Sequence, residues 1–245
     1  MADFNNRTMT QGAQAAVIDQ GLRAYMLRVY NYMAIGLGIT GLAAYFIFGA
    51  AFDASGAPTA LGVALYASPL KWVVILAPLG MVMLLSFGIH RMSVATAQIS
   101  FWVYAALVGV SLASLGAIYT GQSITRVFFI TAAAFGSLSL WGYTTKRDLT
   151  GMGSFLFMGL IGILIASIVN IFLASSAMQF VISVVGVLVF AGLTAYDTQK
   201  IKEMYYEADD ATVAGRKAVM GALTLYLDFI NLFIMLVQLL GQRRD

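Results

Sequence analysis

Long apolar stretches dominate the chain, and short polar segments separate them. A helix that crosses the hydrocarbon core of a bilayer needs about 20 mostly apolar residues, at about 1.5 Å of rise per residue. Seven stretches meet this requirement, at 29–51, 69–89, 95–119, 123–145, 151–173, 178–199 and 217–241. The pattern predicts an all-α integral membrane protein with seven transmembrane helices.

Composition supports the bilayer as the solvent of this chain. Hydrophobic residues make up 60% of the sequence and charged residues 10%, and the mean hydropathy is +0.86. A soluble domain of this length cannot bury so much apolar surface. Residues 1–23 are polar and lack the apolar core of a signal peptide. We therefore expect a polar cytoplasmic N-terminal tail over 1–23 and a single seven-helix membrane domain over 24–245.

The basic residues predict an orientation, because cytoplasmic loops carry the excess of Lys and Arg. With the N-terminus inside, ten basic residues are cytoplasmic: Arg7, Arg23, Arg28, Arg91, Lys146, Arg147, Lys200, Lys202, Arg216 and Lys217. Four lie on the other side: Lys71, Arg126, Arg243 and Arg244. We expect the N-terminus in the cytoplasm and the C-terminus outside, whereas an even number of spans would place both termini inside. Basic residues spread over loops do not indicate nucleic-acid binding.

The last apolar stretch carries a line of polar and small residues. Its members are separated by three or four positions, which places them on one helix face: Lys217, Gly221, Thr224, Asp228, Asn231, Met235 and Gln238. A polar stripe on an otherwise apolar spanning helix faces the bundle interior or a water-filled cavity. Asp228 is the most informative member, since an acid within a span is by default a functional hypothesis.

The preceding stretch has a sparser line at the same spacing: Ser183, Gly186, Phe190, Thr194 and Asp197. Asp228 lies eleven residues beyond Lys217, which is roughly 16 Å of helical rise. The two acids meet only if the helix of 178–199 extends past Asp197 or the last helix begins within the preceding loop. For Asp197 a local lysine or N–H partner is an equally good interpretation.

Three more polar residues are candidates with simpler alternatives. Arg91 ends the second stretch on the predicted cytoplasmic side, where an arginine is also an ordinary anchor at the membrane surface. His90 is the one histidine of the chain, and an interfacial role explains it. Asn170 lies within the fifth stretch, where it either bonds a neighbouring helix or lines a path.

Two motifs near the C-terminus resemble the Bax inhibitor-1 family, also called the transmembrane Bax inhibitor motif family, including its bacterial members. They are AGLTAYDTQKI and LYLDFINLFIMLVQLLG, separated by a charged loop, and the segment GYTTKRDLTGMGSFLF also fits. The resemblance covers most of the chain. It implies seven helices with the last one central and the other six around it. It also implies a pH-sensitive calcium leak controlled by two aspartates, Asp197 and Asp228, with Arg91 as a latch in the closed form.

Elementary electrostatics agrees with this expectation. Two carboxylates close together in a low dielectric cannot both ionise cheaply, so a shared proton would hold them together. Oxygen ligands suit a hard cation such as calcium, and a loose set allows the ion to leave again. We expect weak, transient calcium binding at Asp197 and Asp228, with Thr224, Asn231, Asn170 and Gln238 as candidates for the cation path.

Two other classes of function compete with the channel. An intramembrane aspartyl protease also uses paired aspartates, but Asp228 lacks that family's Gly-x-Gly-Asp turn, and Pro58, Pro69 and Pro78 lie far upstream of the expected Pro-Ala-Leu motif. A non-conducting regulator would bind a membrane quality-control protease or other membrane proteins, a role associated with some bacterial relatives. Without cysteine the chain has no disulfide, thiolate metal site or cysteine nucleophile.

The sequence therefore predicts a non-enzymatic cation leak channel, most simply in a bacterial inner membrane. Its expected partners are the lipid bilayer, protons and calcium as the transported ion, and one open alternative is a protein partner in the membrane. No cofactor and no nucleic acid are expected.

Overall fold

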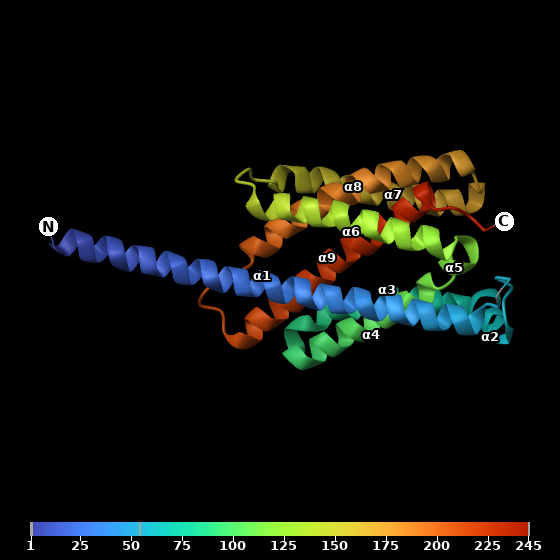
Figure 1. Cartoon of the computed structure of the whole chain (residues 1–245), viewed down its shortest axis with the longest axis horizontal. Coiled ribbons are helices and arrows are strands. Elements are labelled where there is room, and N and C mark those ends of the chain that lie inside the picture. Colours follow the sequence, from blue (N-terminus) through green and yellow to red (C-terminus); the bar gives the residue numbers. More distant parts are fainter. Residues whose placement is uncertain (1, 54, 245) are drawn as a thin grey trace.

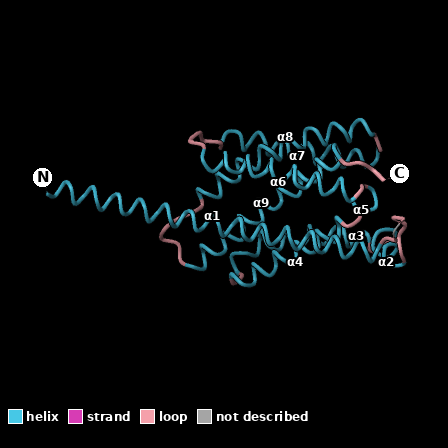
Figure 2. The backbone as a smooth tube through the Cα atoms, in the orientation of Figure 1, coloured by secondary structure: helices cyan, strands magenta, loops and turns pink. Residues whose placement is uncertain are grey.

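The protein is a bundle of long helices (Figure 1; Figure 2). The computed structural model describes residues 2–53 and 55–244, with side chains from Asp19 onward. The helices are α1 (Ala2–Ala51), α2 (Ala60–Gly62), α3 (Lys71–Gly88), α4 (Val94–Leu112), α5 (Leu115–Ile118), α6 (Gly121–Thr144), α7 (Thr150–Leu173), α8 (Ser176–Glu203) and α9 (Ala211–Leu240). A π-helical turn follows α2 at Val63–Ala67, and a 3₁₀ turn follows α3 at Ile89–Arg91.

Among the described residues, seven helical segments are long and apolar enough to cross a membrane, which confirms the predicted number. They are Asp19–Ala51, Lys71–Arg91, Val94–Ile118, Gly121–Thr144, Thr150–Leu173, Ser176–Glu203 and Ala211–Leu240. The first, sixth and seventh are longer than their apolar sequences, because the helices continue into polar flanking residues. Residues 2–23 belong to the helix α1, and their cytoplasmic location stays a prediction.

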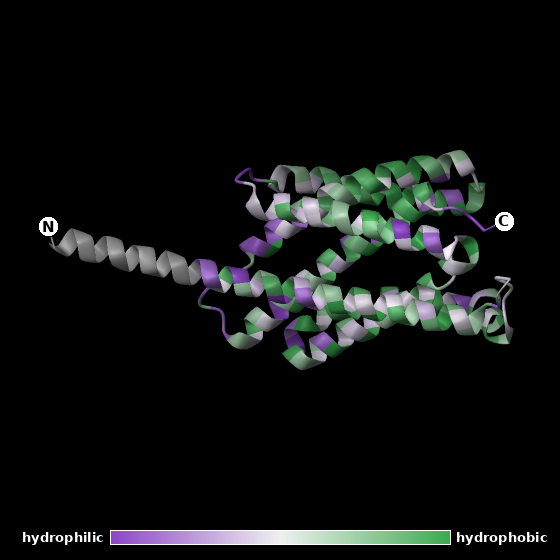
Figure 3. Cartoon of the chain, viewed as in Figure 1, coloured by the Kyte–Doolittle hydropathy of each residue, from purple (hydrophilic) through white to green (hydrophobic). Residues whose placement is uncertain are grey.

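Successive spanning helices alternate in direction between two ends of the bundle. The α3–α4, α6–α7 and α8–α9 connections share one end, and the C-terminus lies at the other (Figure 1). Hydrophobic residues follow the helices between these ends, and polar residues gather in the connections (Figure 3). We call the end with the α3–α4, α6–α7 and α8–α9 connections the basic end. Ten of the fourteen basic residues belong to the segments that meet there. Which end faces the cytoplasm stays a prediction.

The last helix has the largest buried share of the seven spans. It packs mainly against α8, α1, α6 and α4, whereas α3 lies against α4 and α7 lies against α8. The sequence predicted that six helices surround the last one. The main contacts of α9 are with four of them, so its central position stays a prediction.

Between Lys217 and Gln238, Tyr226 is the one polar residue of α9 that departs from the predicted stripe, and it has a partner on another helix. The Tyr226 hydroxyl shares a hydrogen bond of 2.6 Å with Thr40 of α1, and Thr40 also donates to the carbonyl of Ala105 in α4 at 2.8 Å. The ring of Tyr226 meets Phe101 edge-on, with 5.5 Å between centroids. This contact joins α1, α4 and α9 on the side of α9 that faces away from α8.

The start of α9 is defined by a side-chain cap. The Asp210 carboxylate accepts hydrogen bonds from the backbone N–H groups of Thr212 and Val213, at 2.7 and 2.8 Å. Such a cap satisfies N–H groups that have no partner within the helix. The bonds from Val213 and Thr212 lower the pKa of Asp210.

Replacing Asp210 by Ala should lower the melting temperature at neutral pH by about 2–4 °C, because the cap is lost. The folded-state pKa is the lower one, so the cap stabilises the protein above the unfolded pKa and is lost as pH falls through the folded pKa. The difference between wild type and Asp210→Ala should therefore shrink in acid. Thermal unfolding in detergent across pH measures it, with Asp210→Ser as the variant that keeps a cap. Equal melting of Asp210→Ala and wild type at pH 7 would contradict the assignment.

Candidate functional site

The two polar lines predicted from the sequence face each other across the interface of α8 and α9. Near the C-terminal end of α9, Ser183 donates to Gln238 at 2.8 Å. One turn away, Gly186 leaves room for the Met235 side chain, whose sulfur would lie 2.8 Å from a Cβ at this position. The helices are antiparallel, so each step along α8 in one direction matches a step along α9 in the other. This register brings the two acidic positions together.

Asp197 of α8 and Asp228 of α9 face each other at this interface. Their carboxyl groups lie within hydrogen-bonding reach of each other. Asp228 is 5% exposed, and Asp197 is half-buried. Both sequence-based conditions are met, since α8 continues to Glu203 and α9 begins at Ala211.

A hydrogen bond between two carboxyl groups requires a proton on one of them. The Oδ2 atom of Asp228 is buried and has no donor among the described protein groups. An ionised, unpaired carboxylate in this position would be costly. A proton held by either aspartate supplies the missing donor, so the geometry suits a pair that carries one proton and one negative charge.

The close approach of α6 fixes the position of Asp197. Gly142 of α6 lies against the backbone of Ala195, whose oxygen would be 2.2 Å from a Cβ at position 142. Thr198, next to the acid, shares a hydrogen bond of 2.9 Å with Ser139, and Ser139 shares another with Tyr30 of α1. A chain of hydroxyl groups therefore runs from α8 through α6 to α1 beside the acid pair.

The residues after Asp197 anchor the connection between α6 and α7. The Gln199 side chain accepts from the N–H of Leu149 and donates to the carbonyl of Arg147, both at 2.8 Å. Lys202 donates to the carbonyl of Tyr143 at 2.8 Å, and its ammonium group lies 5.2 Å from the centre of that ring. The motif around Asp197 therefore binds the GYTTKRDLTG segment, which links two of the motifs noted in the sequence.

The connection between α8 and α9 is closed by Lys217. Its ammonium group forms an ion pair with Asp209 at 2.6 Å and donates to the carbonyl of Met204 at 3.0 Å. The ring of Tyr205 lies 5.7 Å from that of Tyr25 in α1. The first polar residue of the α9 stripe thus holds the loop and lies away from the acid pair.

Arg91 does not join the acids in this conformation. It is exposed at the end of the second span, and the one salt bridge among the described side chains is that of Lys217. Lys200, three residues after Asp197 on α8, has its ammonium group 5.9 Å from the centre of the Tyr196 ring. Arg216 of α9, by contrast, donates to the carbonyl of Met92 at 2.7 Å. His90 is exposed in the same turn.

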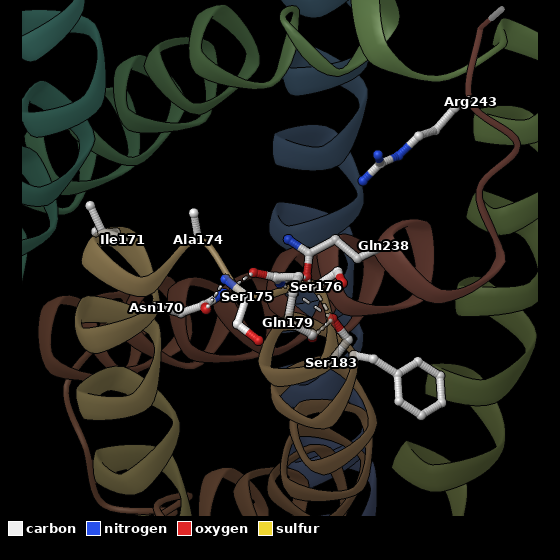
Figure 4. Close-up of a pocket in the computed structure, with 10 residues that line it drawn as sticks. Asn170, Ile171, Ala174, Ser175, Ser176, Gln179, Ser183, Gln238 and Arg243 are labelled. Atoms are coloured by element: carbon white, nitrogen blue, oxygen red, sulfur yellow. Dashed lines mark hydrogen bonds between the residues drawn. The ribbon is translucent and has the colours of Figure 1, made fainter.

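Asn170 and Gln238, two of the residues predicted for the cation path, belong to a separate cluster. This cluster lies at the end of α9 opposite to Lys217. We call Asn170, Gln179, Ser183 and Gln238 the amide cluster (Figure 4). Asn170 donates to Gln179 at 3.2 Å, and Gln179 donates to Gln238 at 2.9 Å. The cluster borders a cavity of about 530 Å³, into which Arg243 extends from the C-terminal segment (Figure 4).

The other two predicted path residues lie on α9 near the acids and bond within their own helix. Thr224 donates to the carbonyl of Met220 at 3.1 Å, and Asn231 donates to that of Leu227 at 2.9 Å. Asp228 and Gln238 are ten residues apart, about 15 Å of rise. Met235 fills the α8 surface between these levels, so the interface is closed there.

Ser139, Thr198 and Gln199 support the site, and the sequence-based prediction did not include them. Thr198 and Gln199 directly follow Asp197, and a polar run continuing at the end of a span was the available signal. Ser139 carried no such signal, because its partner on α8 lies 59 residues away in the chain. Among the described residues, no group of three or more acidic or histidine side chains accompanies the pair as a metal cluster.

Fold and site together define an integral membrane protein with an acidic pair inside its helix bundle. The sequence profile of the family described as "Inhibitor of apoptosis-promoting Bax1" matches residues 22–245. A Rickettsia prowazekii protein is 49% identical over 250 residues, covering all of both chains. The inner membrane protein YbhL of Escherichia coli is 44% identical over 227 residues, covering 91% of this chain and 94% of that protein. This chain belongs to the Bax inhibitor-1 family.

Adding a methyl group at Gly142 should separate α6 from α8, because the backbone oxygen of Ala195 cannot move aside as a flexible side chain would. We expect Gly142→Ala to destabilise the folded protein by about 1–3 kcal/mol. Gly136→Ala is the matched control in the same helix, since a Cβ there meets nothing within 4 Å. Melting temperatures in detergent compare the two. Equal stabilities would show that α6 and α8 do not approach this closely.

Proposed function

We propose that this protein is a pH-sensitive cation leak channel that conducts calcium and is gated by Asp197 and Asp228. The observation that carries the proposal is the placement of two carboxyl groups within hydrogen-bonding reach at a buried helix interface. A buried acid is costly to a membrane protein. Well-packed apolar residues would serve as well if stability alone were required, so the pair calls for a functional reason.

Proton exchange supplies the gating step. With one shared proton the pair carries one negative charge, and the hydrogen bond joins α8 to α9. Without that proton the two charges repel at short range in a low dielectric. The protonation state of the pair therefore changes the force between two helices whose interface is otherwise closed by Met235 and the amide cluster.

Calcium fits the chemistry of the pair, since hard cations take oxygen ligands. Two carboxyl groups offer few of the six to eight oxygens that a tight calcium site uses. A weak site of this kind suits conduction, which requires that the ion also leave. Asn231 and Gln238 extend the polar line from the acids toward the far end of α9, so the proposed path follows the α8–α9 interface.

The relatives of the chain and its distribution of charges support a proposed location. YbhL is named an inner membrane protein, and we propose the same membrane for this chain. The basic end would face the cytoplasm, which places the N-terminus inside and the C-terminus outside.

Calcium flux into liposomes that contain the purified protein, measured from pH 5 to pH 8, tests the channel. The wild-type flux should change with pH. Asp228→Asn and Asp197→Asn should flatten that response, because an amide cannot exchange the proton. Asp148→Asn is the matched control, since Asp148 is an exposed acid in the α6–α7 connection and its Asn substitute still caps Thr150.

A folded wild-type protein that gives no flux above empty liposomes at any pH would overturn the proposal. The regulator would then be the better hypothesis, with bound membrane proteins as its test. Cleavage of a peptide that requires both aspartates would instead favour the protease.

Arg91 enters the proposal as the latch for the acids. It is exposed in this conformation, so it reaches the pair only if the α3–α4 turn moves. We expect Arg91→Gln to shift the pH at which flux changes, by removing the cation that favours the ionised pair. Arg28→Gln, at an exposed position of α1, is the control. The same pH profile for Arg91→Gln and wild type would exclude Arg91 as the latch.

A further inference from the structure

A groove of about 720 Å³ separates α1 from α6 on the side of the bundle. Its α1 wall consists of residues at helical spacing from Arg23 to Leu37, and its α6 wall runs from Ala132 to Tyr143. Fourteen residues of α1 correspond to about 21 Å of rise. This volume is in the range of sites that hold a small molecule, and the length is about two thirds of a hydrocarbon core.

The groove is amphipathic along its length. The hydrogen bond between Tyr30 and Ser139 fixes the register of the two walls. In this register Arg23 and Tyr143 lie toward the same, basic end of the groove, and Leu37 and Ala132 lie toward the apolar end. Lys202 is not a lining residue of the groove, and its ammonium group is already bonded to the carbonyl of Tyr143, so Arg23 is the cation that a headgroup in the groove would meet. Arg23 forms no ion pair with a described side chain.

We infer that this groove binds one acyl chain of an anionic phospholipid, with the headgroup at Arg23. Both walls belong to membrane-spanning segments, so the occupant comes from the bilayer. The apolar walls suit an acyl chain, and the positive end suits a negatively charged headgroup over a zwitterionic one. Tyr30 and Ser139 satisfy each other, so the middle of the groove does not demand a polar ligand.

The bound chain would contact the residue next to the acid pair. Phe229 of α9 forms part of the groove and follows Asp228 directly. The hydroxyl chain from Tyr30 also ends at Thr198, beside Asp197. Lipid binding is nevertheless independent of the channel proposal, because it can be measured without any ion flux.

Native mass spectrometry of the purified protein in micelles tests the site, with equal amounts of dioleoyl phosphatidylglycerol and dioleoyl phosphatidylcholine. We expect one bound phosphatidylglycerol, with about fivefold preference over phosphatidylcholine. One arginine near an anionic headgroup contributes about 1 kcal/mol, which corresponds to this factor. Gly136→Leu fills the groove, since a Cβ there meets nothing within 4 Å, and should abolish this retention. Gly162→Leu in α7 is the matched control, because it is equally open and lies outside the groove.

The headgroup contact is tested by a second pair of variants that leave the groove unfilled. Arg23→Gln should reduce the ratio of retained phosphatidylglycerol to phosphatidylcholine to about one. Arg28→Gln should leave that ratio at the wild-type value. Equal retention of the two lipids by wild type, or the same retention by Gly136→Leu and Gly162→Leu, would overturn the inference. If Gly136→Leu fails to fold, the arginine pair decides. Displacement of the lipid by soluble glycerol phosphate would mean that only a surface anion site exists.

Discussion

The antiparallel pairing of α8 with α9 is the interaction on which the rest of this structure depends. It aligns two lines of small and polar residues, so that Ser183 meets Gln238 and Gly186 receives Met235. The same register brings Asp197 to Asp228 inside the bundle. A shift by one turn would leave a buried carboxyl group facing apolar side chains, which is costly in lipid. The register and the acid pair therefore require each other.

The remaining helices are arranged around this pairing according to how closely each can approach it. Gly142 lets α6 touch the backbone of α8 near the acids. On the far side of α9, Tyr226 and Thr40 join α1. Because α1 and α6 approach α9 from different sides, a groove remains between them, closed at its base by Phe229. The close contact of α6 with α8 and the open groove between α6 and α1 therefore result from the same arrangement of helices.

The polar side chains of the bundle differ in whether they have a hydrogen-bond partner. Gln199, Lys202 and Lys217 bind backbone carbonyls or loop residues and are satisfied in place. Three buried polar atoms have no partner among the described groups: the Tyr25 hydroxyl, the Trp102 indole nitrogen and Asp228 Oδ2. Of these, only Asp228 is a carboxyl group that needs a proton to complete its hydrogen bonding. The acid pair therefore concentrates the dependence of the bundle on protons at one point, which is what the proposed gate requires.

The sequence by itself determined the seven spans and the polar faces of the last two helices. These depend on local hydropathy and on a spacing of three or four residues, which are readable along one chain. Tertiary structure alone decided which faces meet, because contacts such as Ser139 with Thr198 join residues far apart in sequence. It separated Asn170 and Gln238 from the acids, left Arg91 exposed and opened the groove between α1 and α6. Periodicity fixes the face that a helix presents, whereas the neighbour, the register and the distance depend on how side chains of different helices fit together.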